Sequence, residues 1–556
     1  MNSLNTILTA NLSTLSTVGI MFATSVAIMF LMIQGGKIFF KGMQQRGYHA
    51  VGYLNWISKS NNRFMYRLSN VCIFSMVAYV TFSVIFAPFS GAKFSFLGLV
   101  FFYVFTMVFF KTNKLTKLPE RQSIDYTARL KRLEVTFSVL VFLLAFGVFV
   151  GMNVFHLKTG WKFIEYCRYI LICIFPLLLP YLVLLANAIN SPFEKLNIAR
   201  YGKIAHDILQ KNNIKVVAVT GSFGKTTTKD LIASLLGEKY NVASAPKSFN
   251  TPSGVALTVQ NYVTEQTEFA VLEMGARNVG DIAYLCNIAK PDYSVITSVG
   301  LQHIESFKNF DNVKKTKFEL IENTKKGGIS FFNCADEGAK ELFDKTETEK
   351  YSIGEENSDL IFKVIKVDQN GSLFTVKLDG EEFEFTTKLL GRHNVENVCV
   401  AIMVAYKLGV EIETLQRAVA GVEPTEHRLQ MIKKEHAIVI DDSYNSNVKG
   451  VKYAAEVLSM FEGRKILVTP GLVELGKMED ESNRELGRVF GKVCDKIILV
   501  GNMRAVQITM GLKEVGFDFD NLITFENFNE AKSSLFAVMK KGDVVLFEND
   551  IPDSYL

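Results

Sequence analysis

Two hydrophobic patterns divide the chain near residue 190. Before it, apolar runs lie near 15–34, 69–88, 94–110, 135–156 and 168–188, and each comes close to the roughly 20 helical residues that cross a bilayer. After it, short β-branched runs alternate with amphipathic stretches, which is the pattern of an α/β protein. We therefore predict an α-helical transmembrane domain of about five helices over residues 1–190, followed by water-soluble α/β domains.

The distribution of basic residues predicts the orientation of the helices. The loop after the first span and the loop after the third span are rich in Lys and Arg, including Lys37, Arg46, Lys111 and Arg132. Because such residues are retained on the cytoplasmic side, the N-terminus is predicted outside. Everything after about residue 190 is then predicted to be cytoplasmic. The chain is thus expected to be a multi-pass protein of the cytoplasmic membrane.

Composition narrows the candidate partners and cofactors. The net charge of +5 comes from 61 Lys and Arg residues against 56 Asp and Glu residues. In the first half the basic residues lie beside apolar runs, so we predict membrane flanks and no nucleic-acid partner. Seven cysteines are scattered without a C-x-x-C pair, which indicates neither a disulfide framework nor a zinc ribbon.

A phosphate-binding loop is predicted where a β-branched run meets glycines and then an amphipathic helix. The segment reads Lys215-Val-Val-Ala-Val-Thr-Gly-Ser-Phe-Gly-Lys-Thr-Thr-Thr. Gly221 and Gly224 would let backbone N–H groups face phosphates, Lys225 would reach the β- and γ-phosphates, and Thr226 would bind Mg²⁺. Ser222 and Thr227 belong to the same loop. The glycines are one residue closer than in the usual G-x-x-x-x-G-K-[ST] form, so this is a compact variant.

Two later strand ends carry groups suited to cation binding. Val271-Leu-Glu-Met-Gly-Ala places Glu273 at the carboxyl end of a strand, where ligands bind in open α/β sheets. A second strand breaks at Gly300 and is followed by His303. Taken alone, Glu273 would be a solvated strand end and His303 a packed or surface residue.

Together these segments resemble the Mur ligases, the ATP-dependent enzymes that assemble the peptide of peptidoglycan. The phosphate loop G-S-F-G-K-T-T-T-K carries the resemblance first, and further matches follow in family order across roughly residues 199–556. The MurF type, which adds D-alanyl-D-alanine, looks most similar. The resemblance implies a P-loop central ATP-binding domain over residues 191–422 and a C-terminal domain over residues 423–556. Strand-like runs at Ala437–Ile440, Lys465–Thr469, Lys496–Val500 and Val544–Phe547 indicate that the latter is Rossmann-like.

The resemblance also implies roles for single residues. Glu273 and His303 would bind two Mg²⁺ ions. In Lys314-Lys-Thr-Lys-Phe-Glu-Leu, Lys317 would be a carbamylated lysine that binds or orients a Mg²⁺ ion. The alternative for this lysine-rich run is a solvated helix face. In Leu390-Gly-Arg-His-Asn-Val-Glu-Asn-Val, Asn394 and Asn397 would contact nucleotide or hold its loop, with helix capping as the alternative. Arg428 would reach the γ-phosphate, Asp442 the ribose, and Tyr444 and Asn445 the nucleotide. Asn250 and Thr251 would bind the acceptor.

The predicted catalytic set consists of Lys225, His303, Lys317 and Arg428. It would be completed by closure of one domain over the other about a hinge near residues 421–425.

The chain departs from the family in two places. Only about 25 residues separate the last predicted span from the strand before the phosphate loop, too few for the domain that normally holds a UDP-sugar. We therefore predict an acceptor that is lipid-linked or otherwise presented at the membrane. Pro470-Gly-Leu-Val-Glu-Leu-Gly and Phe547-Glu-Asn-Asp also differ from the family pattern, so the amine cannot be assigned as D-alanyl-D-alanine.

The predicted activity is thus an ATP-dependent amide ligase that forms an acyl phosphate. Its partners would be a cell-wall or surface-glycan precursor and the amine of an amino acid or peptide. A P-loop ATPase coupled to membrane transport or sensing is the alternative. A degenerate nucleotide-binding scaffold is a third reading, against which the intact Lys225, Glu273, His303 and Arg428 argue. The sequence leaves the oligomeric state open.

Overall fold

The chain forms two compact units in the structure, a computed structural model. One contains residues 1–196 and the other residues 197–551. The described residues are 2–58, 68–70, 72–74, 76–77, 81, 126–161, 167, 171, 173–300, 304–434, 436–444, 446–473, 475, 478–501, 504–526 and 528–549, with backbone alone at 2–14, 304, 305 and 536.

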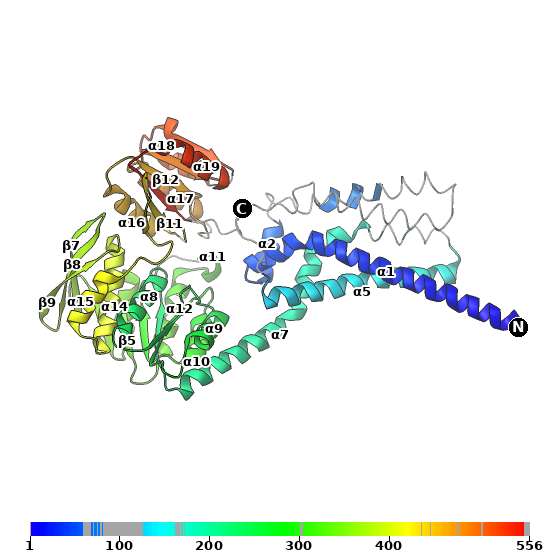
Figure 1. Cartoon of the computed structure of the whole chain (residues 1–556), viewed down its shortest axis with the longest axis horizontal. Coiled ribbons are helices and arrows are strands. Elements are labelled where there is room, and N and C mark those ends of the chain that lie inside the picture. Colours follow the sequence, from blue (N-terminus) through cyan, green and yellow to red (C-terminus); the bar gives the residue numbers. More distant parts are fainter. Residues whose placement is uncertain are drawn as a thin grey trace. The chain divides into compact units, whose positions relative to one another are not determined.

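The described part of the first unit is helical. Its helices are α1 (Asn2–Gln45), α2 (Ala50–Ser58), α5 (Ala128–Thr159) and the beginning of α7 (Phe175–Lys211) (Figure 1). The rings of Phe40 on α1 and Phe137 on α5 meet edge to face with centroids 5.0 Å apart. An ion pair joins Arg132 of α5 to Glu194 of α7 through two hydrogen bonds of 2.6 and 3.0 Å. Aromatic packing and this charge-assisted pair therefore hold the described helices together.

Three of the described helices are long and apolar enough to cross a membrane. The apolar 18-residue window of each helix has a mean hydropathy of 2.1 in Leu15–Gln45, 2.5 in Ala128–Thr159 and 1.3 in Phe175–Lys211. They coincide with the first, fourth and fifth predicted spans. The second predicted span is described only in part, and the third, with the basic loop around Lys111, lies outside the described residues. The count of five spans and the orientation therefore stay predictions.

Helix α7 continues past the end of the predicted apolar span. It ends at Lys211, and β1 (Lys215–Thr220) begins four residues later. The predicted boundary at residue 190 thus falls inside a helix. Ala205 and Leu209, near the end of α7, are buried in the core of the second unit. No domain is inserted between α7 and β1, in agreement with the short spacing in the sequence.

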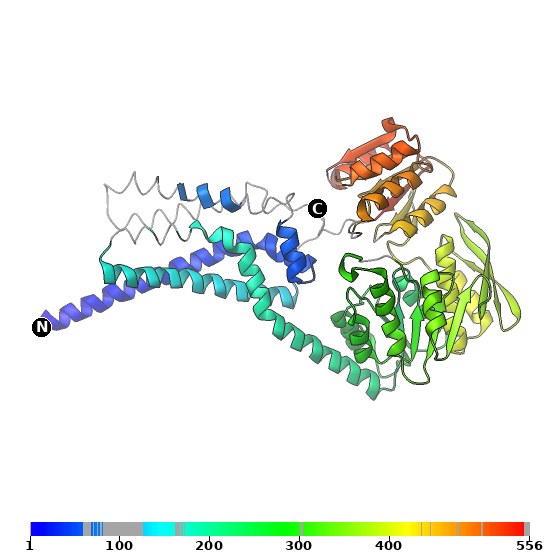
Figure 2. The same ribbon diagram turned by 180° about the vertical axis from the view of Figure 1, so that it is seen from behind.

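The central domain, drawn in green to yellow in Figure 2, is built on a nine-stranded sheet in the order β2-β3-β1-β4-β5-β6-β7-β8-β9. The strands after β1 are β2 (Val242–Ser244), β3 (Phe269–Glu273), β4 (Tyr293–Ile296), β5 (Ile329–Asn333), β6 (Lys350–Gly354), β7 (Leu360–Asp368), β8 (Gly371–Leu378) and β9 (Glu381–Thr387). The helices are α8 (Lys225–Gly237), α9 (Pro252–Tyr262), α10 (Asp281–Ala289), α11 (Ile304–Phe307), α12 (Phe310–Glu322), α13 (Glu337–Lys345), α14 (Arg392–Lys407) and α15 (Ile412–Gly421). Pairing is parallel from β2 to β7 and antiparallel from β7 to β9.

The central strands are buried on both faces, which explains their continuous apolar sequences. Along β1, Val217 and Val219 enter a core shared with α8, α14 and α15. Val216 and Ala218 enter the opposite core with α9, α10, α12 and α13. Two cores of this kind fix the sheet, so the carboxyl ends of β1, β3 and β4 lie together at one edge.

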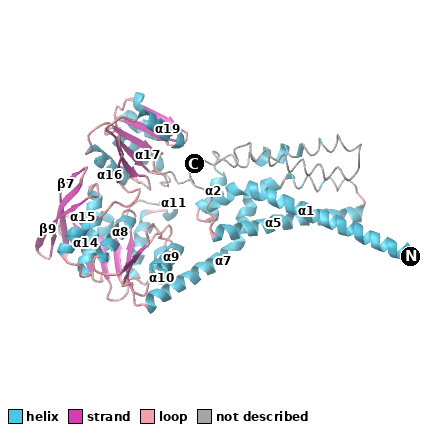
Figure 3. Ribbon diagram, viewed as in Figure 1, coloured by secondary structure: helices cyan, strands magenta, loops and turns pink. Residues whose placement is uncertain are grey.

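The C-terminal domain contains a second sheet, whose strands are magenta beside α16, α17 and α19 in Figure 3. Its strand order is β10-β11-β15-β12-β13-β14. Its strands are β10 (Gln430–Lys433), β11 (Ala437–Asp442), β12 (Lys465–Thr469), β13 (Lys496–Val500), β14 (Leu522–Phe525) and β15 (Asp543–Glu548). Its helices are α16 (Val448–Ser459), α17 (Glu479–Phe490), α18 (Ala505–Glu514), η3 (Phe519–Asn521) and α19 (Phe528–Val538). All strands except β10 pair in parallel, which confirms a Rossmann-like sheet.

Candidate active site

The predicted phosphate loop lies between β1 and the N-terminus of α8. Gly224 precedes α8 with a φ of 78°, and a Cβ there would lie 2.6 Å from the Oδ1 of Asn397. At Gly221 a Cβ would lie 2.0 Å from the Oγ1 of Thr297. Glycine is therefore needed at both positions by close contact, and at Gly224 also by the left-handed backbone. The first N–H groups of α8 have no partner within the helix and can receive an anion.

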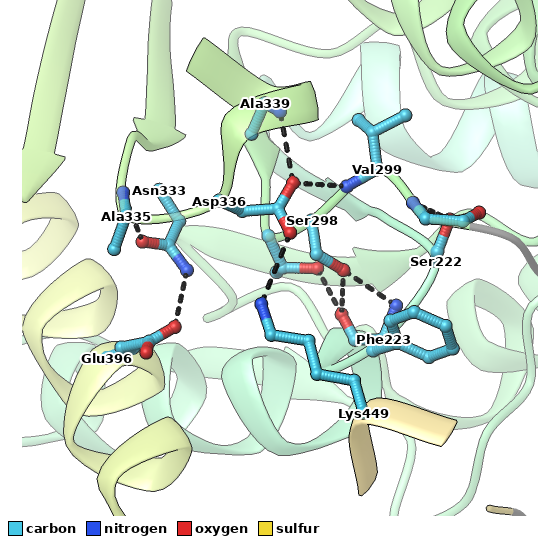
Figure 4. A network of polar contacts seen from close by, with 12 residues as sticks. Ser222, Phe223, Ser298, Val299, Asn333, Ala335, Asp336, Ala339, Glu396 and Lys449 are labelled. Atoms are coloured by element: carbon cyan, nitrogen blue, oxygen red, sulfur yellow. Dashed lines mark hydrogen bonds and ion pairs between the residues drawn. The ribbon is translucent and has the colours of Figure 1, made fainter. Parts of the chain in front are cut away.

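Hydrogen bonds attach this loop to the segment that follows β4. The N–H of Ser222 donates to the carbonyl of Ser298 (2.8 Å), and the Ser222 hydroxyl donates to the carbonyl of Gly300 (2.9 Å). The N–H of Phe223 donates to the Ser298 hydroxyl at 2.8 Å, as Figure 4 shows. Ser222, predicted to contact nucleotide, thus uses its polar groups to hold the loop in this structure.

A polar cluster at the end of β3 suits a hard cation. The Thr226 hydroxyl donates to Glu273 at 2.8 Å, and the Ser248 hydroxyl does so at 2.9 Å. The Asn250 amide also donates to Glu273, at 2.8 Å. Glu273 is only 2% exposed. Carboxylate and hydroxyl oxygens are ligands that Mg²⁺ accepts, with phosphates and water completing its shell. Thr226 and Glu273 are therefore placed to hold Mg²⁺ together.

Two lysines, Lys225 and Lys317, lie at the same edge of the sheet. Lys317 on α12 is 3% exposed, and its Nζ donates to the Thr220 hydroxyl at 3.4 Å. Burial, followed by the charge of Lys225, lowers the pKa of Lys317 well below its ordinary value. Burial also lowers the pKa of Lys225; the charge of Glu273 opposes this shift, and the charge of Arg428 adds to it. A buried, neutral lysine amine is a nucleophile, as carbamylation by carbon dioxide requires.

Helix α14 packs against the phosphate loop. The Asn397 Oδ1 accepts from the Thr228 hydroxyl at 3.2 Å and lies against Gly224. Asn394 donates to the carbonyl of Leu390 at 2.8 Å. Gly391 occupies the N-cap position without a side-chain cap, so helix capping, the alternative for these asparagines, is not observed. Asn397 instead packs beneath the phosphate loop.

In the C-terminal domain, Arg428 lies between two residues with positive φ, His427 (61°) and Leu429 (44°). Its guanidinium lies 4.4 Å from the ring centre of Tyr444. The Oδ1 of Asp442, at the end of β11, accepts from the N–H of Leu429 at 3.2 Å. The structure thus brings Arg428, Asp442 and Tyr444 together, as predicted, and the charge of Arg428 acts on both Asp442 and Lys225.

Sequence reasoning missed a contact between the two domains. Lys449 on α16 lies 3.5 Å from Asp336 of the central domain (Figure 4). Asp336 accepts from the N–H groups of Val299 (2.9 Å) and Ala339 (3.1 Å), so it joins α13 to the segment beside the phosphate loop. Nearby, the partly buried ring of His393 stacks on Tyr453, with centroids 4.7 Å apart. Burial, with the charges of Lys449 and Arg428, lowers the pKa of His393 to about 4.

Several predicted residues have other positions or are not described. Thr251, predicted to bind the acceptor, caps α9 by accepting from the N–H of Gly254 at 3.2 Å. Asn250 contacts Glu273, as described above. Thr227 is buried in the first turn of α8. His303 and Asn445 lie outside the described residues. Within the described part of the chain, no three His, Cys, Asp or Glu side chains group as a metal site, so nucleotide oxygens would have to complete one.

Comparisons with known proteins agree with this arrangement. The Mur ligase middle domain family matches residues 219–405, and the family described as Mur ligase, glutamate ligase domain matches residues 427–548. The UDP-N-acetylmuramoyl-tripeptide--D-alanyl-D-alanine ligase of Bacillus subtilis (strain 168) is 33% identical over 353 residues, which cover 62% of this chain and 75% of the relative. Among solved structures, MurF from Acinetobacter baumannii superposes with a TM-score of 0.59 at 25% identity, covering 64% of this chain and 78% of that one. MurF from Thermotoga maritima in complex with ADP gives 0.57 at 26% identity, covering 64% and 80%.

Proposed function

The chain belongs to the Mur ligase family, and from this premise we propose that it joins an amino acid or peptide to the carboxylate of a cell-wall or surface-glycan precursor at a membrane. As a family member it is an ATP-dependent, ADP-forming ligase. The observation that carries the proposal is the gathering of Lys225, Glu273 and Lys317 at one sheet edge, within the electrostatic reach of Arg428.

We propose that the reaction proceeds in two displacements. An oxygen of the acceptor carboxylate attacks the γ-phosphorus of ATP, ADP leaves, and an acyl phosphate forms. The amine then attacks the acyl carbon, inorganic phosphate leaves, and the amine loses a proton as the amide forms. Both steps bring anions together, so the fixed cations Lys225 and Arg428 offset their repulsion.

Mg²⁺ bound by Thr226 and Glu273 would neutralise phosphate charge. We propose a second Mg²⁺ near His303 and a carbamylated Lys317. Two facts support the carbamate: the amine of Lys317 is buried, and its pKa is lowered towards the neutral form that reacts with carbon dioxide. Asn394, Asn397, Asp442, Tyr444 and Asn445 are proposed on the nucleotide side of the site.

We further propose that the apolar helices anchor the ligase in the cytoplasmic membrane with its catalytic domains in the cytoplasm. Three described helices of sufficient length and hydropathy support this. The direct passage from α7 into β1 leaves no inserted domain at the position expected for UDP-sugar binding. A lipid-linked acceptor therefore suits the chain better than a free UDP-linked one. The alternative of a transport or sensing ATPase has less support, because both Mur ligase domains are matched in order.

The full-length protein in lipid vesicles tests this proposal. ADP release is measured with Mg²⁺, ATP, a panel of amines that includes D-alanyl-D-alanine, and either lipid-linked or UDP-linked muramoyl peptides. We expect ADP release that requires both acceptor and amine, with a product heavier than the acceptor by the amine less one water. ADP release independent of acceptor and amine would overturn the ligase proposal. Equal activity on both acceptors would overturn the lipid-linked acceptor alone.

A further inference from the structure

Two carboxyl groups lie side by side at the carboxyl end of the second sheet. β11 and β15 pair in parallel with Asp442 opposite Glu548. Glu548 is fully buried, whereas Asp442 keeps part of its surface accessible. The family pattern did not predict an acid at position 548, since this segment departs from it. A buried glutamate next to a predicted nucleotide ligand needs a physical explanation.

The contacts of Glu548 show what is missing. One carboxyl oxygen accepts a hydrogen bond from the Ser446 hydroxyl. The other has no donor among the described residues, although the Asp442 carboxyl lies within hydrogen-bonding contact. Two ionised carboxylates cannot form such a contact, because both accept and neither donates. One proton held between them satisfies both groups and removes one of the two buried charges.

The environment determines which group keeps that proton. Burial, then the charge of Asp442, raises the pKa of Glu548 well above its ordinary value. Burial raises the pKa of Asp442 to about 6, while the charge of Arg428 and the N–H of Leu429 act to lower it. At neutral pH the proton therefore belongs to Glu548, and Asp442 is the ionised partner.

We propose that Glu548 is a positioning residue: it stays protonated and donates a hydrogen bond to Asp442, fixing that carboxylate towards Arg428 and the ribose of the nucleotide. The ribose contact rests on the function proposed above, whereas the proton on Glu548 does not. Glu548 is too deeply buried to touch the nucleotide. It acts through Asp442, which keeps part of its surface accessible.

Few other charged groups lie next to the Asp442–Glu548 pair. Asp441, beside Asp442 on β11, is paired with His427 at 2.8 Å. On the β15 side, Asn549 donates to the carbonyl of Gly471 at 2.8 Å and accepts from the N–H of Ser446 at 3.1 Å. Gly471 follows β12 and contributes only backbone here. Arg428 is thus the cation that acts on Asp442, and lowering the pH would protonate Asp442 and weaken that attraction.

Two substitutions separate donation from mere packing. In Glu548→Gln, the amide oxygen can accept from Ser446 and the amide nitrogen can donate to Asp442, so the geometry is kept without an acidic proton. Glu548→Leu has a similar volume and no donor. Glu462→Gln, an exposed change in the same domain, is the matched control.

The first measurement uses the full chain without nucleotide. Infrared spectra at pH 7.5 should contain the carbonyl band of a protonated carboxylic acid, which Glu548→Gln removes and Glu462→Gln keeps. The second is the dissociation constant for Mg-ADP. We expect Glu548→Gln to remain within about twofold of the parent, and Glu548→Leu to weaken binding about tenfold, as loss of a charge-assisted hydrogen bond implies.

The outcomes are distinguishable. A band that persists in Glu548→Gln would overturn the proposal whatever the nucleotide does. Equal weakening in the Gln and Leu variants, or no weakening in either, would overturn the positioning role. Failure of the proposed ligase function would show differently, as ADP release that never depends on acceptor and amine, with the infrared band still lost in Glu548→Gln.

Discussion

In the second unit, each of the two sheets has like-charged side chains close together at the carboxyl ends of its strands. The charges are lysines in the first sheet and carboxyl groups in the second. At the first edge burial lowers the pKa of both Lys317 and Lys225; the charge of Lys225 adds to the shift of Lys317, and the charge of Arg428 adds to the shift of Lys225. At the second edge burial raises the pKa of both Asp442 and Glu548, and the charge of Asp442 raises the pKa of Glu548 further. An excess of buried positive charge can be relieved by phosphate anions, whereas the acidic pair is relieved by a single proton.

The difference extends to how each edge is satisfied. The carboxylate of Glu273 accepts hydrogen bonds from Thr226, Ser248 and Asn250. Glu548 has one hydroxyl donor and one oxygen for which the described residues supply none. We therefore propose that the first edge receives substrate and metal and that the second orients one side chain. Substitutions at the first edge should reduce catalysis more than conditions that titrate the second.

The largest effect is expected at the phosphate loop. Lys225→Ala should lower amine-dependent ADP release by about 10³-fold, because it removes a fixed cation from a site where phosphate charge develops. Steady-state turnover of the full-length protein is the measurement. Lys239→Ala, an exposed lysine of the same domain, serves as the control and should stay near the parent rate. Turnover of Lys225→Ala within tenfold of the parent would show that the loop does not hold the transferred phosphate.

The next effect tests the second lysine of that edge. Lys317→Ala should lose about 10²-fold in turnover, since the group that orients a cation near the reacting phosphate is gone. If Lys317 is a carbamate, ¹³C-labelled bicarbonate should give a carbamate carbon signal in the parent and none in the variant. Removing carbon dioxide should also slow the parent reversibly. A parent protein without that signal would refute the carbamate while leaving the lysine's own role to the turnover measurement.

A smaller effect is expected from titrating the acidic edge. Because burial raises the pKa of Asp442 to about 6, the carboxylate is ionised above that value and is lost as the pH falls through it. The dissociation constant for Mg-ADP should therefore rise about fourfold between pH 7.5 and 5.5. Asp442→Asn should bind weakly at both pH values, and its residual slope corrects for ionisation of the nucleotide itself. A parent curve parallel to that of the variant would exclude Asp442 as the titrating group.

The smallest effect should come from the contact that joins the two domains. Lys449→Ala removes a half-exposed ion pair with Asp336, and such pairs contribute about 0.2–1 kcal/mol. Turnover should fall about threefold, because the domain-closed arrangement is less populated. Lys452→Ala, on the same helix and paired with Glu485, is the matched control. If the two variants behave alike, the contact has no special part in closure.

The sequence was most informative where a functional element consists of consecutive residues. The phosphate loop, the strand ending at Glu273, and the strands of the second sheet were predicted because each depends on local spacing of glycine, apolar and polar residues. Lys317 was selected by resemblance, since a run of lysines on a helix otherwise indicates a solvated face. Its burial depends on how α12 packs against β1, which no local pattern shows.

The contacts that escaped prediction join residues far apart in the chain. Asp442 and Glu548 are 106 residues apart and meet only because β15 inserts beside β11. Lys449 and Asp336 lie on different domains, and each is an ordinary charged residue of an amphipathic helix or its cap. Thr251 lies at the N-cap of α9, a position that a threonine before proline also suits, and its predicted contact with the acceptor stays a prediction.

One consequence concerns the short stretch of chain that carries Arg428. His427 and Leu429 both adopt left-handed backbone angles, a conformation that costs a non-glycine residue about 1 kcal/mol or more. The buried side chain of Leu429, its N–H bond to Asp442 and the His427–Asp441 pair hold this backbone in place, so the position of the Arg428 guanidinium is fixed from both sides. Laboratory selection for thermostability should therefore change the exposed position 427, to asparagine or glycine, before the buried position 429, and the selected variants should turn over more slowly.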